Sequence, residues 1–353
     1  MSYLFLVHIK NKRRRQDGEK PTLQAIPMEK DGTEEETRTI HNDDDDSSSL
    51  KSTAEMRSWS DMTHECLVVI ISRLSIEDRW KGTMLVCKSW MEASRDASLF
   101  TTFDLDHFFL SAAGDTSLWW SPHFERRIDA MLRSAALCAD GRMREIRLRH
   151  CSDWSLVLAA ERSPVLQVLS IKSCPNVTDL SITKIASTCS MLRVLDISYC
   201  YEISHKSLEL IGRGCPNLKV LKRNLMNWLD PSQHSGIVPD EYLNACPQDG
   251  DREAVTISSF MHNLEHLELR FSKLTGDGLE WISEGCGNLE HLDLFGCANL
   301  TSRAMERASA KLKNLKRLVR PNFYIPRVLF HTERYGHWRL YDDRFQTGAF
   351  FQI

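Results

Sequence analysis

The chain lacks the cysteine spacing that marks a zinc-binding or disulfide-stapled domain. Its eleven cysteines are an odd number, no two are spaced as C-x-x-C, and no cysteine pair precedes a histidine pair at zinc-finger distance. These absences argue against a disulfide scaffold and against a structural metal site. We therefore expect reduced thiols and no bound metal.

Signals for export or membrane insertion are also missing. No apolar run approaches the roughly 20 residues that span a bilayer. The opening MSYLFLVHIK has no basic flank ahead of its short apolar run and no small-residue cleavage site. We expect a soluble protein of the nucleus, the cytoplasm or both, without a membrane partner.

Motifs of catalysis and nucleotide binding are absent. The sequence holds no G-x-x-x-x-G-K-[ST], no G-x-G-x-x-G and no H-E-x-x-H. His262 and His266 are four residues apart but straddle the start of an expected strand, so we interpret them as exposed turn residues and not as ligands. His331 and His337 lie among aromatic residues without a nearby thiol. The chain is not expected to be an enzyme or to carry a cofactor.

Charge is placed unevenly along the chain. Residues 1–55 hold 9 Lys and Arg and 12 Asp and Glu, and the remainder holds 36 of each sign. Residues 1–57 are predicted to be a disordered tail, because dense charge leaves too little apolar surface to bury. KNKRRR at 10–15 is either a solvated part of that tail or a nuclear import signal. The balanced charge of the remainder argues against nucleic acid as a partner.

A compact helical unit is predicted over residues 58–104. DMTHECLVVIISRLS has apolar residues on one helical face, with Thr63 or Asp61 as the cap. That face consists of Cys66, Leu67, Ile70, Ile71 and Leu74. A second short helix breaks at Gly82, and a further apolar turn runs through Met84, Leu85, Val86 and Trp90. About 45 residues make a marginal core, so we expect a partner or a neighbouring domain to support the unit.

Residues 105–142, with Phe124, Ile128, Met131 and Leu132 on one helical face, are interpreted as a helical linker.

Leucine then recurs at a nearly constant interval. Leu166, Leu192 and Leu218 are 26 residues apart, and Leu264, Leu289 and Leu315 are 25 and 26 apart. Each opens L-x-x-L-x-L or L-x-x-L-x-I, an alternation that suits a strand with one buried face. Cysteine follows three residues after the last apolar position of several units. The predicted core positions are Leu166, Leu169, Ile171, Cys174, Leu192, Leu195, Ile197, Cys200, Leu218, Leu264, Leu267, Leu289, Leu292 and Cys297.

Each strand is followed by a helix signal. A hydroxyl residue that can cap a helix comes four residues after the cysteine position, as Thr178, Ser204, Thr275 and Thr301. Apolar pairs for an inner helix face follow, and Cys189, Cys215 and Cys286 close three helices. One such unit cannot bury its apolar face alone, but stacked units can. Counting from Met143, we expect seven units over 143–320, with the cysteines used as small buried hydrophobes.

Two places break the period. Leu218 to Leu264 spans 46 residues, which leaves an insertion at about 224–262 that is either a tolerated surface loop or part of a binding face. Within it, DREAVTISSFM is expected to resume as a helix. The ending 321–353 holds nine of the thirty aromatic residues and is predicted to cap the last repeat, with a partner-binding surface as the alternative.

Residues 60–104 resemble an F-box. The resemblance rests on the opening DMTHECLVVIISRLSIEDRW and the closing LVCKSW. The family usually has Leu-Pro before Glu65, and this chain has Met62 and Thr63, where Thr can cap in place of Pro. With the cysteine-containing repeats, residues 60–353 resemble plant F-box/leucine-rich-repeat proteins of the Skp-interacting partner group.

The resemblance implies an α/β protein, an all-helical F-box followed by a leucine-rich-repeat solenoid. It implies a substrate receptor of a Skp–cullin–F-box ubiquitin ligase that leads a bound target to ubiquitination and proteasomal degradation. The partners would be Skp, cullin through Skp, and an unidentified target protein on the repeats. The Skp contacts would be Met62, Glu65, Leu67, Ile70, Leu74, Val86 and Trp90. The alternative is a scaffold outside any ligase, whose repeats bind a protein partner.

Overall fold

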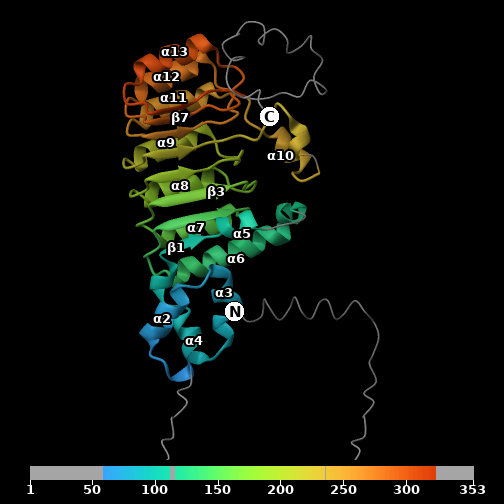
Figure 1. The fold of residues 1–353 in the computed structure, drawn as a ribbon, viewed down its shortest axis with the longest axis vertical. Helices are drawn as coiled ribbons and strands as arrows, with labels where there is room; N and C mark the ends of the chain where they lie inside the picture. Colours follow the sequence, from blue (N-terminus) through green and yellow to red (C-terminus); the bar gives the residue numbers. More distant parts are fainter. Residues whose placement is uncertain (1–58, 112–115, 235, 323–353) are drawn as a thin grey trace, which may run out of the picture. The chain divides into compact units, whose positions relative to one another are not determined.

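The computed structural model describes residues 59–111, 116–234 and 236–322, which belong to a compact unit spanning Arg57–Ile353 (Figure 1). The predicted tail 1–57 with its KNKRRR segment, and the aromatic segment from residue 323 onward, lie outside the described residues. Whether that segment caps the repeats or binds a partner therefore stays a prediction. In the described part of the chain, no helix is long and apolar enough to cross a membrane.

The first described element group is a small helical unit. Its elements are η1 Trp59–Asp61, α2 His64–Ser72, α3 Ile76–Lys81, η2 Thr83–Leu85, α4 Lys88–Ala93 and η3 Ala97–Phe100. Thr63 caps α2 by accepting from the backbone N–H of Cys66 at 3.5 Å, and Ser75 caps α3. Helix α3 ends at Gly82, where the sequence predicts the break.

The buried face of α2 is narrower than its apolar pattern predicts. Only Leu67 and Ile71 are buried, Ile70 and Leu74 are half-buried, and Cys66 is exposed. A short helix touches its neighbours along one narrow strip, so apolar residues beside the strip stay in contact with solvent.

Eight parallel strands follow in chain order and form one sheet. They are β1 Thr102–Asp104, β2 Glu145–Arg149, β3 Val168–Lys172, β4 Val194–Asp196, β5 Val220–Lys222, β6 His266–Glu268, β7 His291–Asp293 and β8 Arg317–Val319. Strands β2 to β8 are the seven expected units, and β1 is an additional strand that the repeat pattern did not predict. The α/β fold class is confirmed, since a small helical unit is followed by eight parallel strands with helices between them.

Helices stack beside the strands, one after each strand from β1 to β7 (Figure 1). They are α6 Pro122–Cys138, α7 Asp153–Arg162, α8 Asp179–Thr188, α9 His205–Gly214, α11 Asp251–Phe260, α12 Gly276–Gly285 and α13 Ser302–Lys311. Helix α6 packs on α7 and buries Ile128 and Leu132. Residues 105–142 are therefore more than a linker, because α6 is the first helix of the stack and follows β1. The short helix α5 Asp106–Ser111 and η4 Ser117–Trp120 lie between them.

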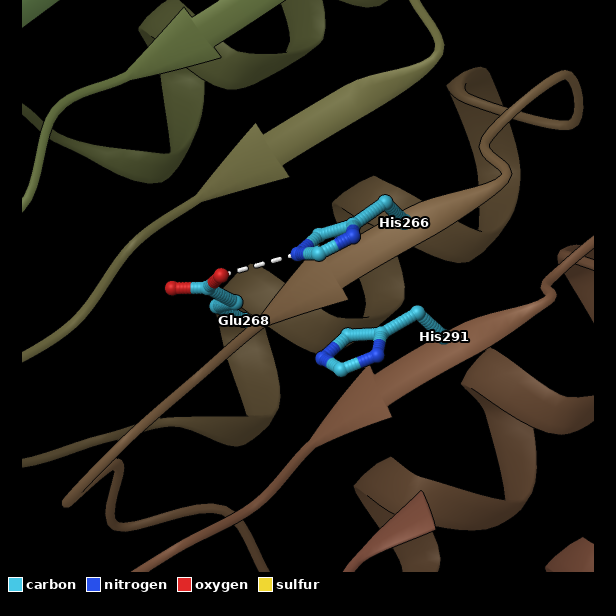
Figure 2. A group of neighbouring side chains, drawn as sticks. All are labelled: His266, Glu268 and His291. Atoms are coloured by element: carbon cyan, nitrogen blue, oxygen red, sulfur yellow. Dashed lines mark hydrogen bonds and ion pairs between the residues drawn. The ribbon is translucent and has the colours of Figure 1, made fainter. Parts of the chain in front are cut away.

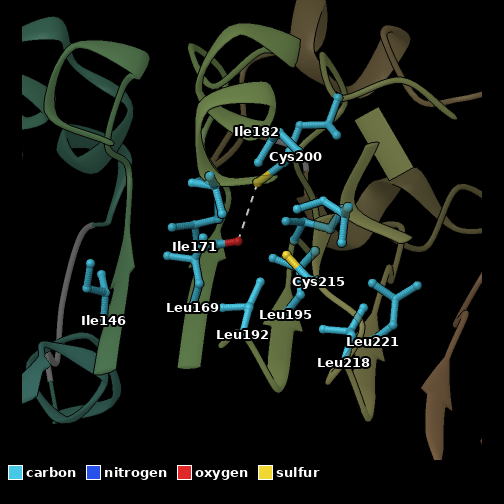
Figure 3. Packing of buried hydrophobic residues seen from close by; sticks show 14 of the residues in the cluster. Ile146, Leu169, Ile171, Ile182, Leu192, Leu195, Cys200, Cys215, Leu218 and Leu221 are labelled. Carbon is cyan, nitrogen blue, oxygen red and sulfur yellow. Dashed lines mark hydrogen bonds between the residues drawn. The ribbon is translucent and has the colours of Figure 1, made fainter. Parts of the chain in front are cut away.

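The repeat core follows the leucine and cysteine period (Figure 3). All fourteen predicted core residues are buried, and none is more than 3% exposed. The four predicted hydroxyl caps each accept a backbone N–H of the following helix. Burial raises the pKa of the Cys189 thiol to about 12, so the group stays protonated. It donates to the carbonyl of Ser163 in the preceding repeat at 3.5 Å, as a small residue with a weak donor.

The insertion is folded onto the repeats. It contains η5 Pro231–His234 and α10 Asp240–Asn244, and α11 then restores the regular stack, as the sequence predicts. Tyr242 of α10 stacks on Tyr201 with ring centroids 4.8 Å apart and contacts Trp120 at the same separation. Because aromatic residues anchor α10, the segment is not a loose surface loop.

A buried ion pair holds the same region. Arg223 stands where other repeats have Ile171, Ile197 or Leu269, and its side chain is fully buried. Its guanidinium donates to Glu253 of α11 at 3.1 Å and to the Ile203 carbonyl at 2.8 Å. Arg223 therefore connects the end of β5 to α11, the helix in the second half of the insertion.

Candidate protein-binding surfaces

The helical unit exposes several large apolar side chains. Trp59 is 67% exposed, Val69 55%, Leu85 52% and Val86 58%. Val69 lies on the face of α2 away from Leu67, and Leu85 and Val86 end the turn that precedes α4. A unit of this size that leaves so much apolar surface in water is suited to binding a protein partner.

The residues predicted to contact Skp occupy different environments. Val86 and Glu65 are exposed, and Met62, Ile70, Leu74 and Trp90 are half-buried. Leu67 is fully buried in the core, so the structure contradicts its assignment as a surface contact. It faces inward because it shares the narrow buried strip of α2 with Ile71.

Sequence reasoning missed Val69, Leu85 and Trp59 as surface residues. Within an apolar run such as LVVIIS, each residue lies 100° around the helix from the previous one, and composition alone cannot tell which one faces the core. Val69 lies two residues from both Leu67 and Ile71, on the side of α2 opposite the buried strip. A helical wheel centred on those two residues is the signal that could have found it.

The helical unit is joined closely to the repeats. Trp80 of α3 packs on Phe103 of β1 with ring centroids 5.9 Å apart, and Phe103 is buried. Within the unit, the Arg79 guanidinium donates to the carbonyls of Leu74, Leu99 and Ser72 at 3.0, 2.9 and 2.9 Å, which holds α3 to η3, the element directly before β1. A partner held on the helical unit is therefore positioned relative to the first strand of the sheet.

The second surface is the sheet face that the helices leave open. One row across neighbouring strands runs from Val168 through Val194 and Val220 to His266 and His291. The adjacent row is polar: Ser170, Asp196, Lys222, Glu268 and Asp293. The face thus combines an apolar strip with charged groups, a composition typical of protein-binding surfaces.

Charges on this face are paired across strands. Lys172 lies 3.5 Å from Asp196, Lys222 2.8 Å from Glu268, and the Arg270 guanidinium 2.7 Å from Asp293. Burial alone would raise the pKa of Glu268, but hydrogen bonds from Lys222, His266 and Asn224 lower it to about 2. The carboxylates of Asp196 and Asp293 are buried, so the more exposed partners Lys172, Lys222 and Arg270 are the charged groups that a bound protein can contact.

A pocket of about 510 Å³ lies where the insertion meets the loops after the strands. Tyr199, Phe271 and Phe295, from the loops after β4, β6 and β7, line it, together with Met226 and His234 of the inserted segment. Trp228 anchors the insertion there by donating from its indole N–H to the Phe271 carbonyl at 2.7 Å. The pocket is concave and rich in aromatic groups, as sites for a peptide side chain commonly are.

The repeat cysteines do not form a reactive site. The thiols of Cys174 and Cys200 are buried and their pKa values are raised well above the ordinary value by burial. A protonated, enclosed thiol is a poor nucleophile and a poor metal ligand. The cysteine pattern therefore serves packing.

Comparison with known proteins places these surfaces in a family. Residues 59–102 match the F-box domain, and residues 260–283 match the leucine-rich repeat. The chain is 54% identical over 293 residues to the F-box protein SKIP1 of Arabidopsis thaliana, covering 82% of this chain and 97% of that one. An F-box/LRR-repeat protein of the same plant is 52% identical, covering 80% and 93%. The F-box protein SKIP19 is 28% identical, covering 70% and 72%. The chain therefore belongs to the plant F-box/leucine-rich-repeat family.

Proposed function

We propose that this protein is the substrate receptor of a Skp–cullin–F-box ubiquitin ligase. One observation carries the proposal: an F-box with exposed Val69, Leu85 and Val86 is packed directly against a sheet whose open face is free to bind a second protein. The name of the relative SKIP1 is consistent with a Skp partner for this chain. Cullin would join through Skp.

The mechanism is proximity and not catalysis by this chain. The repeats hold a target protein while the F-box holds the ligase, so target lysines stay at high effective concentration near an enzyme supplied by the complex. The packing of Trp80 on Phe103 supports this role because it fixes the distance between the two binding surfaces. Ubiquitination would then lead the target to the proteasome.

Target binding is assigned to the open sheet face together with the aromatic pocket. Tyr199, Phe271 and Phe295 follow strands β4, β6 and β7, so the pocket adjoins that face. An aromatic or long aliphatic side chain of the target fits the pocket, and the paired charges around Asp196 and Glu268 select the residues beside it.

Affinity purification from plant cells, with and without a proteasome inhibitor, tests the proposal. The wild-type protein should retain Skp and cullin, and its targets should accumulate when the proteasome is inhibited. A Val69→Asp/Val86→Asp variant should lose Skp and cullin but keep the targets. The protein is a scaffold outside any ligase if it captures targets without Skp or cullin and if the abundance of those targets is the same with and without the inhibitor.

A further inference from the structure

Two histidines and a glutamate meet on the open face of the sheet (Figure 2). His266 of β6 and His291 of β7 are direct partners in the parallel register, and Glu268 is two residues after His266 on the same face. One nitrogen of each imidazole and one carboxylate oxygen all lie within 4.8 Å of one another. The two rings stack with centroids 4.1 Å apart and an angle of 14°. Figure 2 shows both rings projecting the same way, with His266 bonded to Glu268.

The strands hold these side chains ready for a ligand. The backbones of β6 and β7 are fixed by the sheet, and all three side chains are partly exposed, so a small ion can reach them. Burial and the neighbouring His266 and Arg317 lower the pKa of His291, which leaves that imidazole neutral near pH 7 and able to donate a lone pair. Glu268 is ionised under the same conditions.

We propose that His266, His291 and Glu268 form a binding site for a divalent transition metal ion, with zinc as the best fit. Two imidazoles and one carboxylate are a common donor set for zinc sites that keep an open coordination position. From the sequence alone we expect no metal ion and interpret His266 as a turn residue, but His266 lies within strand β6. His262 alone occupies the turn, with its ring nitrogen 2.9 Å from the Gly285 carbonyl.

Binding requires a local rearrangement. Zinc–nitrogen bonds are about 2.0–2.1 Å, so the three donor atoms must draw together by small side-chain rotations. The ammonium group of Lys222, 2.8 Å from the Glu268 oxygen that also bonds His266, must release that oxygen. Asn224, which donates to the other oxygen at 3.1 Å, can keep its bond and orient the carboxylate. The unfilled coordination position of the metal ion would face solvent, where a side chain of a second protein can supply the missing ligand.

Zinc titration of the full-length protein by calorimetry, at about pH 7.5, tests the site. One equivalent should bind saturably, and Mg²⁺ should not compete, because imidazoles favour the softer ions. His266→Ala, His291→Ala and Glu268→Gln should each weaken binding about tenfold or more. His262→Ala, which removes a histidine four residues away, should bind zinc like the wild-type protein. Melting curves without metal show whether each variant is folded, and His291→Gln replaces His291→Ala if the alanine variant is not.

Two further measurements separate this site from exposed thiols such as Cys66. Bound Co²⁺ should give visible ligand-field bands without the near-ultraviolet band of cobalt–thiolate bonds. Lys222→Met should tighten zinc binding, since it removes a positive charge that competes for Glu268. Absence of saturable binding, affinity unchanged by both histidine substitutions, or a thiolate band that accounts for the bound metal would overturn the proposal. An affinity that Lys222→Met leaves unchanged would contradict the role of Glu268 as a ligand.

Discussion

Asp179, the first residue of α8, accepts both the backbone N–H and the hydroxyl of Ser204, the residue that caps α9. The two distances are 2.8 and 2.7 Å. The same bidentate contact links Asp153 to Thr178 and Asp251 to Thr275. In these three pairs of repeats, one helix therefore fixes the start of the next, so this part of the stack is held by polar contacts as well as by its leucines.

Asp179→Ala should lower the free energy of unfolding by about 1–3 kcal/mol, because the start of α9 loses three charge-assisted hydrogen bonds, two from Ser204 and one from Ser207. Asp240→Ala is the matched control, since Asp240 begins α10 and is exposed. Urea unfolding of both variants checks the prediction. Equal stability of Asp179→Ala and the control would show that the contact between repeats contributes little.

Cys200→Ser should destabilise the protein by about 1–3 kcal/mol, and Cys200→Ala should be milder. The Cys200 thiol donates to the Ile171 carbonyl at 3.4 Å, a distance that suits sulfur (Figure 3). The covalent Cβ–O bond of serine is shorter than the Cβ–S bond of cysteine. The serine hydroxyl would therefore lie too far from the Ile171 carbonyl for a normal hydrogen bond. Thermal melts compare the two variants, and a serine variant as stable as the wild-type protein would refute the reasoning.

Glu253→Ala should cost about 3–5 kcal/mol, because it leaves the buried Arg223 guanidinium without its counter-charge. Glu253→Gln keeps an acceptor for Arg223 and should be less harmful. Chemical unfolding measures both variants. If alanine and glutamine cost the same small amount, the ion pair does not hold the insertion in place.

Stability should fall on mild acidification because of His150. This residue is buried among Phe109, Trp119 and Trp120, and burial, with a smaller effect of Arg149, lowers its pKa to about 4. Between pH 6.5 and about 4, His150 binds a proton in the unfolded chain but not in the folded chain. The free energy of unfolding therefore decreases as the pH falls. The loss approaches about 3 kcal/mol at 1.36 kcal/mol per pKa unit.

The control for that prediction is His150→Asn, which removes the titrating group while tolerating the left-handed backbone at this position, where φ is 55°. Stability measured from pH 7 to pH 4 should then fall less steeply, whatever its absolute value. A slope identical to that of the wild-type protein would assign the acid sensitivity to other groups.

The leucine and cysteine period was sufficient to predict seven repeats because each position recurs in the same environment. It could not predict β1, which follows the F-box directly and carries Phe103 in place of the leucine pattern. It also could not predict Arg223 in a core position, since a buried charge depends on Glu253, 30 residues away. Contacts that depend on strand register, such as His266 with His291, likewise become visible only when the strands are paired.

The candidate Skp surface was predictable as a segment but not residue by residue. The F-box pattern located the segment and included Val86, which is exposed, but also Leu67, which is buried. The pattern shows which residue types occur together, and the narrow buried strip of α2 decides which of them reach solvent.

The most direct test of the account is the affinity of purified Skp for three forms of the full-length protein, measured by biolayer interferometry. The wild-type protein should bind, and Val69→Asp/Val86→Asp should lose at least tenfold in affinity, since charges replace apolar anchors. Leu180→Asp, which alters an equally exposed apolar residue on α8 of the repeats, should bind like the wild-type protein. Skp binding that the double variant retains in full, or a wild-type protein that does not bind Skp, would contradict the F-box as the attachment surface.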